Sequence, residues 1–137
     1  MADAVTSQTI IDTEKRVVMK FTNLSDGNGE SAVKKVDVSA LTAHPDGTAC
    51  SQVTIDQIWY DIGGMRVLID FAASTNVAAL VLGGSAAAGN VQGHMDFRSF
   101  GGIKNNASSP TGDIDFTTSG HTNLDHYTVI LEMRKQY

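Results

Sequence analysis

The C-terminal stretch of the chain alternates between apolar and polar residues with a period of two. One set of alternating positions is apolar: Tyr127, Val129, Leu131 and Met133. The set between them is polar except for one residue: Thr128, Glu132 and Arg134 are polar, and Ile130 is the exception. Residues two apart share a face of a β-strand, so this pattern predicts a strand with one face in the core and the other toward water.

The same period recurs along the chain, at Val17, Met19 and Phe21 and again at Met65, Val67, Ile69 and Phe71. Weaker versions occupy residues 32–38, 53–62, 77–82 and 113–118, the last with Ile114 and Phe116 pointing inward. Gly-, Asn- and Pro-rich turns separate the stretches, and only residues 72–80 leave room for a helix. We therefore expect an all-β fold, an antiparallel β-sandwich or jelly-roll-like barrel of about eight strands with long Gly-rich loops.

One of these stretches changes register. Val53 and Ile55 would share one face, whereas Ile58, Tyr60 and Ile62 would share the other. Two explanations fit the pattern: a β-bulge near Asp56 and Gln57, or a strand that is buried on both faces.

The length of 137 residues suits a single β domain, residues 1–137. Residues 1–8 have neither a basic nor an apolar stretch, so they predict no secretory signal and are a candidate for an extended arm. The longest apolar run, Val77 to Leu82, is too short for a transmembrane segment. Cys50 is the only cysteine, which excludes an intrachain disulfide, and we expect it to be an inert thiol.

The formal charge of −5 argues against nucleic-acid binding, because a phosphate-binding surface needs clustered Lys and Arg. Basic residues are paired at Lys34-Lys35 and Arg134-Lys135. We expect each pair on a solvated strand face or beside a terminus.

A Gly-rich, charge-poor region spans residues 83–112 and predicts two long loops around a short strand. We take its apolar and polar loop residues as a candidate interaction surface: Phe97, Phe100, Ile103, Lys104, Asn105 and Asn106. An equally weighted alternative is that the apolar members only cap one end of the sandwich.

The sequence predicts no catalytic, cofactor-binding or metal-binding residue, and hence no enzyme. It lacks a Gly-x-Ser-x-Gly elbow, and the glycine-rich stretch from Gly83 to Gly89 lacks the Lys and Ser or Thr of a phosphate loop. Ser25 to Glu30 resembles a calcium loop in composition only, and a β-turn explains it better.

Three further groups invite a chemical interpretation and have a simpler one. His121, Asp125 and His126 have no standard ligand spacing, which favours a polar turn over a metal site. Asp113 and Asp115 share a strand face, and a solvated face explains them better than a glycosidase pair. Trp59-Tyr60 fits a buried aromatic pair better than an exposed sugar-binding platform.

Two long segments, Lys20 to Val38 and Ile58 to Val67, resemble small virion structural proteins of tailed bacteriophages, especially marine and cyanobacterial phages. The resemblance continues through Gly101-Gly102-Ile103, Asn105-Asn106, Thr111-Gly112-Asp113 and Gly120-His121, and spans most of the chain. No motif in it carries known chemistry.

The resemblance implies a capsid decoration or cement protein, located in the virion and assembled in the host cytoplasm. It implies the major capsid protein or other virion proteins as partners, with a second copy of the chain as a further candidate. A neck, tail or baseplate component is the close alternative, and a carbohydrate-binding module is the alternative from another class.

Overall fold

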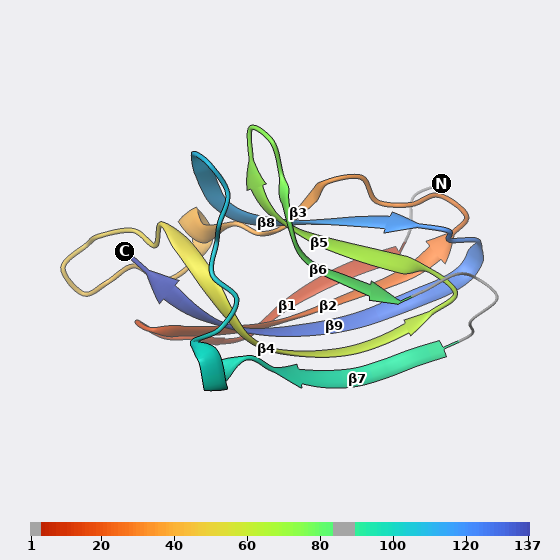
Figure 1. The fold of residues 1–137 in the computed structure, drawn as a ribbon, viewed down its shortest axis with the longest axis horizontal. Coiled ribbons are helices and arrows are strands. Elements are labelled where there is room, and N and C mark those ends of the chain that lie inside the picture. Colours follow the sequence, from red (N-terminus) through yellow and green to blue (C-terminus); the bar gives the residue numbers. More distant parts are fainter. Residues whose placement is uncertain (1–3, 84–89) are drawn as a thin grey trace.

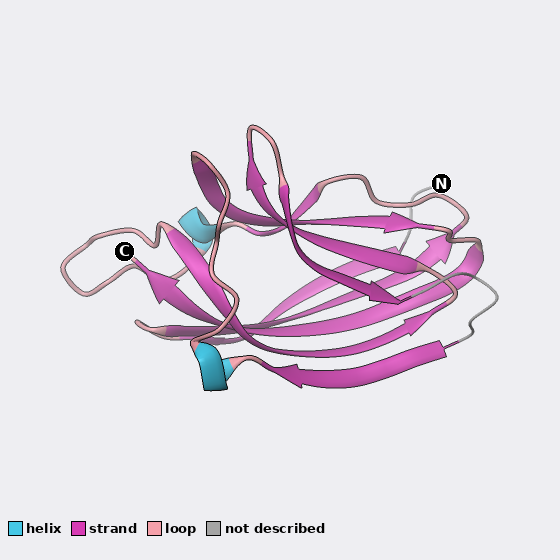
Figure 2. Ribbon diagram, in the orientation of Figure 1, coloured by secondary structure: helices cyan, strands magenta, loops and turns pink. Residues whose placement is uncertain are grey.

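The computed structural model describes residues 4–83 and 90–137, which form nine β-strands and two short 3-10 helices (Figures 1 and 2). Two antiparallel sheets face each other. The five-stranded sheet has the order β1 (Ala4–Asp12), β2 (Arg16–Asp26), β9 (Asn123–Gln136), β4 (Gln52–Gly63) and β7 (Asn90–Asp96). The four-stranded sheet has the order β3 (Val33–Val36), β8 (Pro110–Ser119), β5 (Arg66–Ala73) and β6 (Val77–Gly83). The predicted all-β sandwich is confirmed.

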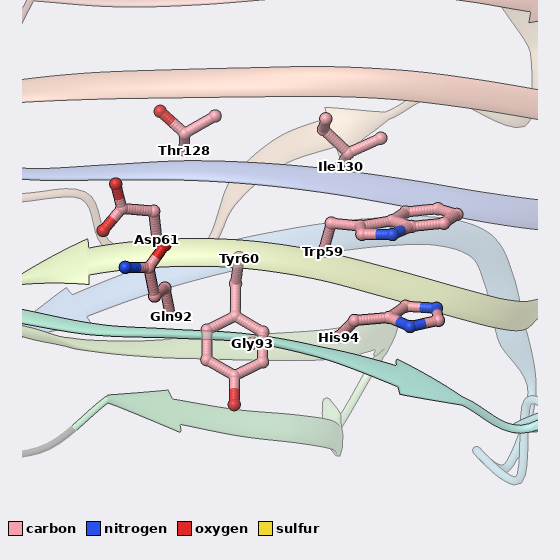
Figure 3. A pocket seen from close by; sticks show the side chains of 8 residues that line it. All are labelled: Trp59, Tyr60, Asp61, Gln92, Gly93, His94, Thr128 and Ile130. Atoms are coloured by element: carbon pink, nitrogen blue, oxygen red, sulfur yellow. The ribbon is translucent and has the colours of Figure 1, made fainter.

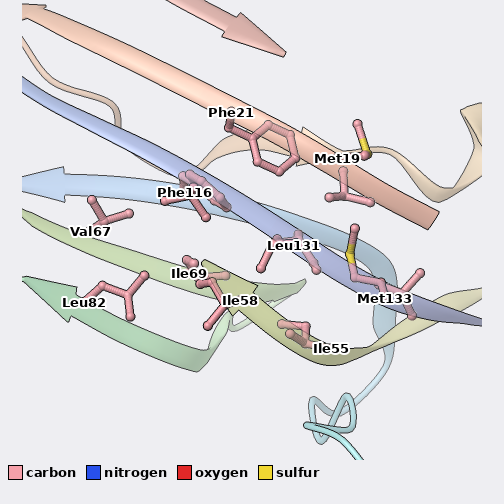
Figure 4. Packing of buried hydrophobic residues seen from close by; sticks show 14 of the residues in the cluster. Met19, Phe21, Ile55, Ile58, Val67, Ile69, Leu82, Phe116, Leu131 and Met133 are labelled. Carbon is pink, nitrogen blue, oxygen red and sulfur yellow. The ribbon is translucent and has the colours of Figure 1, made fainter. Parts of the chain in front are cut away.

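The core lies between the two sheets and is built by the alternation seen in the sequence (Figure 4). In β9, Tyr127, Val129, Leu131 and Met133 are buried, and β5 and β8 contribute Val67, Ile69, Phe71, Ile114 and Phe116 from the opposite sheet. The rings of Phe21 and Phe116 meet edge to face across the sandwich, with centroids 5.1 Å apart. Apolar burial of this kind is the main favourable contribution to folding.

Strand β4 contains the irregularity that the sequence indicated. Its pairing with β9 shifts register between Ile55 and Gln57, so Asp56 is the extra residue of a β-bulge. Because of this shift, Ile55 and Ile58 both reach the core although they are three residues apart. The bulge is therefore the correct one of the two explanations.

The N-terminal stretch and the Gly-rich region each add one strand. Residues 4–8, part of the candidate arm, belong to strand β1 and pair with β2 from Ala4 opposite Leu24 to Gln8 opposite Lys20. Strand β7 is the short strand expected within residues 83–112, and the two 3-10 helices are η1 (Val38–Ala40) and η3 (Arg98–Phe100). Residues 1–3 of the candidate arm and residues 84–89 of the Gly83 to Gly89 stretch lie outside the described residues.

The expectation for the two basic pairs was wrong for one lysine of each. Lys35 is buried and its Nζ pairs with Glu30, while the buried Nζ of Lys135 pairs with Asp12 and donates to the Thr42 carbonyl at 2.9 Å. A long aliphatic stem can be buried when its ammonium meets a carboxylate, and the sequence does not show that partner. Within the described part of the chain, no helix has the length and apolarity required to cross a membrane.

Candidate binding groove on the five-stranded sheet

The outer face of the five-stranded sheet carries an open groove of about 440 Å³ over strands β4, β7 and β9 (Figure 3). Two cross-strand rows of side chains form it. In one row Trp59 of β4 lies between Ile130 of β9 and His94 of β7, and in the other Asp61 lies between Thr128 and Gln92. Tyr60 and Gly93 complete the lining.

An aromatic stack stands in this groove. The rings of Trp59 and His94 are nearly parallel, at an interplanar angle of 8°, with centroids 4.8 Å apart. Trp59 is half-buried and does not belong to the core cluster, so the expected burial of this residue in the core was wrong. The physical reason is strand alternation, since Ile58 and Ile62 occupy the core face of β4 and Trp59 must lie on the other.

Tyr60 behaves differently from its neighbour. Its side chain is half-buried and packs against the core cluster, in agreement with the expectation. Its ring lies against Gly93 of the neighbouring strand, where a Cβ atom would come within 2.8 Å of the Tyr60 hydroxyl. Glycine at position 93 therefore lets the ring cover the backbone of β7.

A chain of polar contacts holds the stack in place. Gln57 Nε2 donates to Glu132 Oε1 at 2.9 Å, and Arg16 pairs with the second oxygen of Glu132 at 3.1 Å. Gln57 Oε1 lies 2.8 Å from His94 Nε2. Because the Gln57 amide nitrogen is directed to a carboxylate, its oxygen must accept, and His94 Nε2 therefore carries the proton. In the neutral ring, Nδ1 is then left as an acceptor.

The candidate interaction surface from the sequence lies elsewhere, in the loop between β7 and β8. It divides into two groups. Phe97 is buried, and Ile103 is partly buried and forms a β-bridge with Ile55, so these two finish the core. Phe100, Lys104 and Asn106 are exposed, whereas Asn105 is half-buried and caps the Ala107 N–H at 3.0 Å.

The residues considered as ion ligands are placed apart or are already used. Asp125 accepts from the Thr122 N–H at 2.7 Å, His121 lies beside Gly29, and His126 lies beside Gly63. Among the described residues, no group of three or more His, Cys, Asp or Glu side chains is placed to hold a metal.

The calcium-like stretch is a turn with an inward carboxylate. Asp26 Oδ1 accepts from the Asn28 N–H at 3.1 Å, as Asp does in a tight turn. Glu30 is buried, and it accepts from Asn23 Nδ2 at 2.9 Å and from the Tyr127 hydroxyl at 2.5 Å. Residues 27–32 form a loop that connects β2 of one sheet to β3 of the other, so the stretch is longer than the single β-turn that the sequence predicted.

Asp113, Asp115 and Cys50 have structural contacts, and the expected solvated face was wrong for Asp113. Asp113 is buried, accepts from the Val38 N–H at 3.0 Å and pairs with Lys34 at 3.2 Å, while Asp115 accepts from Asn76 at 3.2 Å. Cys50 is buried, which raises the pKa of its thiol, and its Sγ donates to the Gln52 carbonyl at 3.3 Å.

The sequence reasoning did not select the groove residues His94, Gln92 and Ile130. The available signal was Ile130, the one apolar residue on the polar face of β9. A lone apolar residue on a solvated face becomes informative only when the sheet order places Trp59 and His94 in the same row.

Comparisons with known proteins give a limited result. No family model matches the sequence, and no curated protein matches it. Among solved structures, a mutant of a family 29 carbohydrate-binding module is similar at 11% identity and a TM-score of 0.36, covering 96% of this chain and 92% of that chain. Two other mutants from the same module family are similar at 9% and 10% identity, each with a TM-score of 0.33 and 96% of this chain covered. The alignment covers 92% and 93% of the lengths of these two mutants.

Proposed function

We propose that this chain is a non-enzymatic virion structural protein of a tailed bacteriophage that decorates the capsid. The virion assignment rests on the resemblance that spans most of the sequence. The observation that supplies a contact is Phe100, which is 65% exposed on helix η3 within the predicted interaction surface. An exposed aromatic ring on an ordered loop is the type of residue that anchors protein interfaces.

The surroundings of Phe100 suit a docking contact. Its ring packs against that of the buried Phe97, with centroids 6.1 Å apart, so a core residue supports the exposed side chain. Lys104 and Asn106, both exposed, lie in the same loop and add polar donors. A preordered apolar anchor with polar groups in the same loop loses little conformational entropy on binding.

Copy number tests the virion proposal. Mass spectrometry of purified particles of the source phage would quantify this chain against the major capsid protein. We expect about one copy per capsid subunit or per capsomer. A few copies per particle would instead assign it to the neck, tail or baseplate, and its absence from particles would refute the proposal.

A pair of matched substitutions tests the docking residue. Phe100→Ser should weaken binding to particles that lack this protein by at least tenfold, corresponding to about 1.4 kcal/mol. Leu124→Ser is the control, because Leu124 is 66% exposed but lies at the start of β9. Equal effects of the two substitutions would remove loop 97–109 from the proposed interface.

A second candidate function, carbohydrate binding, is favoured by the groove. A sugar ring presents apolar C–H groups and many hydroxyls, so its site needs an aromatic surface beside hydrogen-bonding groups. The Trp59–His94 stack supplies the first, and Asp61, Gln92 and Thr128 supply the second. The open groove leaves room for a ligand longer than one ring.

Trp59 also provides the measurement, because it is the only tryptophan in the chain. Titration with a panel of neutral oligosaccharides should give a saturable change in tryptophan fluorescence for at least one of them. Isothermal titration should show that binding disappears in Trp59→Ala and persists in Leu68→Ala, a half-buried residue of β5 in the other sheet. No fluorescence change with the panel, or binding that survives Trp59→Ala, would contradict a sugar site in this groove.

A further inference from the structure

Strand β1 is an edge strand that is exposed on both faces. Its residues from Ala4 to Ile10 are all exposed, although their partners on β2 include the buried Phe21 opposite Ser7. β1 lies at the end of the five-stranded sheet (Figure 1). Within the described residues, β1 pairs with β2 alone, so its second edge keeps unpaired backbone donors and acceptors.

The sequence of β1 does little to prevent pairing at that edge. Edge strands are usually protected by charges, proline, short length or bulges. β1 has nine residues, and no charged residue or proline occurs before Asp12 at its end. Its one irregularity is a register shift between Thr9 and Ile11, which leaves the stretch from Ala4 to Thr9 regular.

The other sheet edges are better protected. β3 has four residues and contains Lys34 and Lys35, and β7 contains Gly93 and His94 and ends at Asp96. β6 is uncharged like β1, but it is shorter, with seven residues, and its pairing with β5 shifts register between Ile69 and Asp70. β1 is therefore the longest unprotected edge.

We propose that a second copy of this chain pairs its β1 with this β1 in antiparallel orientation, forming a twofold dimer with one continuous sheet. The two strands of such a pair are identical, so any like charges would oppose each other, and this stretch carries none. A twofold axis also satisfies the same open edge on both copies at once. The dimer goes beyond the decoration function and does not depend on it.

Any register whose axis passes through a residue places each pair of facing residues on the same side of the sheet, and we choose the one centred on Ser7 because Ser7 lies within the regular stretch from Ala4 to Thr9. Centring the axis on Ser7 sets Val5 opposite Thr9 and Ala4 opposite Ile10. β-branched and apolar cross-strand pairs of this kind stabilise antiparallel strands. The dimer then presents both Trp59 grooves on one face of the joined sheet.

A cysteine cross-link tests the pairing directly in the full chain. In Ser7→Cys the two new side chains face each other across the axis, at a Cβ separation of about 5 Å that allows a disulfide after a small adjustment. We expect a disulfide-linked dimer on mild oxidation. Ser74→Cys, on the exposed turn after β5, is the control and should stay monomeric, and the native Cys50 is buried and does not compete.

A charge substitution tests the same edge without covalent chemistry. Analytical ultracentrifugation should show a concentration-dependent dimer whose dissociation constant rises at least tenfold in Ser7→Lys, which opposes two ammonium groups at the axis. Val81→Lys, on the other uncharged edge, should leave the dimer unchanged, and circular dichroism would verify that both variants fold. A monomer at all concentrations, or a dimer lost in Val81→Lys and kept in Ser7→Lys, would overturn the proposal.

Discussion

The outer faces of the two sheets arrange their polar groups in opposite ways. On the five-stranded sheet, Gln57 donates a hydrogen bond to the Glu132 carboxylate, and Arg16 forms an ion pair with it. The negative charge of Glu132 is therefore compensated. On the four-stranded sheet, Asp70 of β5 lies directly opposite Asp115 of β8, so two carboxylates are neighbours, and the cation of this cross-strand row, Lys34 of β3, lies on the far side of Asp115 from Asp70. Asn76 lies beside this pair and donates to Asp115 at 3.2 Å.

One carboxyl group on each of the two sheets also has a shifted pKa, and the two shifts have opposite directions. Arg98 forms hydrogen bonds with Asp96 at the end of β7 and lowers the pKa of that carboxyl to about 2. Burial raises the pKa of Asp70 above its ordinary value, and the charge of Asp115 raises it further. The binding candidate lies on the five-stranded face because that face carries the groove and the Trp59–His94 stack.

The largest expected effect is that of removing Glu132 from the compensated face. Glu132→Ala leaves the Gln57 amide without its acceptor at a buried position and should cost about 2 kcal/mol of unfolding free energy. Urea unfolding would measure it. Arg16→Ala is the control, because that side chain is 50% exposed and its loss should cost less than about 1 kcal/mol. If Glu132→Ala costs no more than Arg16→Ala, the buried Gln57–Glu132 hydrogen bond adds nothing beyond the exposed ion pair.

The opposite sign is expected on the four-stranded face. Asp70→Asn removes one of two facing carboxylates and should raise the unfolding free energy by about 0.2 to 1 kcal/mol at neutral pH. The pKa of Asp70 is raised in the folded state, so the folded form binds its proton more tightly than the unfolded chain does. The stability that the wild-type protein gains from protonated Asp70 is complete below the unfolded pKa of 3.8 and is lost as pH rises through the folded pKa.

Urea unfolding of wild type and Asp70→Asn at several pH values would test both the sign and the range. The advantage of the variant should grow as pH rises from acidic to neutral. A variant that is less stable than wild type at neutral pH would break the comparison between the two faces.

The alternation in the sequence was sufficient to predict the sandwich because each strand with one buried face must place apolar residues at every second position. It predicted the core faces of β2, β5, β8 and β9, and the break in β4 left two explanations, of which the structure shows the bulge at Asp56. β1 escaped prediction because it is exposed on both faces and so has no apolar period to detect.

The candidate site was harder to predict, because it depends on the order of strands that are distant in sequence. One cross-strand row contains Trp59, His94 and Ile130, and it exists only because β9 and β7 flank β4. Lys35 and Lys135 were misplaced for the same reason, since their partners Glu30 and Asp12 become neighbours only through folding. Local patterns report which face a residue occupies, and they do not report what lies beside it.

The smallest expected effect is on the titration of single carboxyl groups, with little change in stability. NMR titration should place the pKa of Asp96 at about 2, and Arg98→Ala should return it toward the ordinary value. The contribution of Asp96 to folding stability is present above its unfolded pKa and is lost as pH falls through the folded pKa near 2. In the same experiment Asp70 should titrate above the ordinary range, in the opposite direction. If the pKa values of Asp96 and Asp70 shift in the same direction, the contrast between compensated and opposed charges on the two faces is wrong. Shifts in opposite directions would show that the contrast holds at these two carboxyl groups.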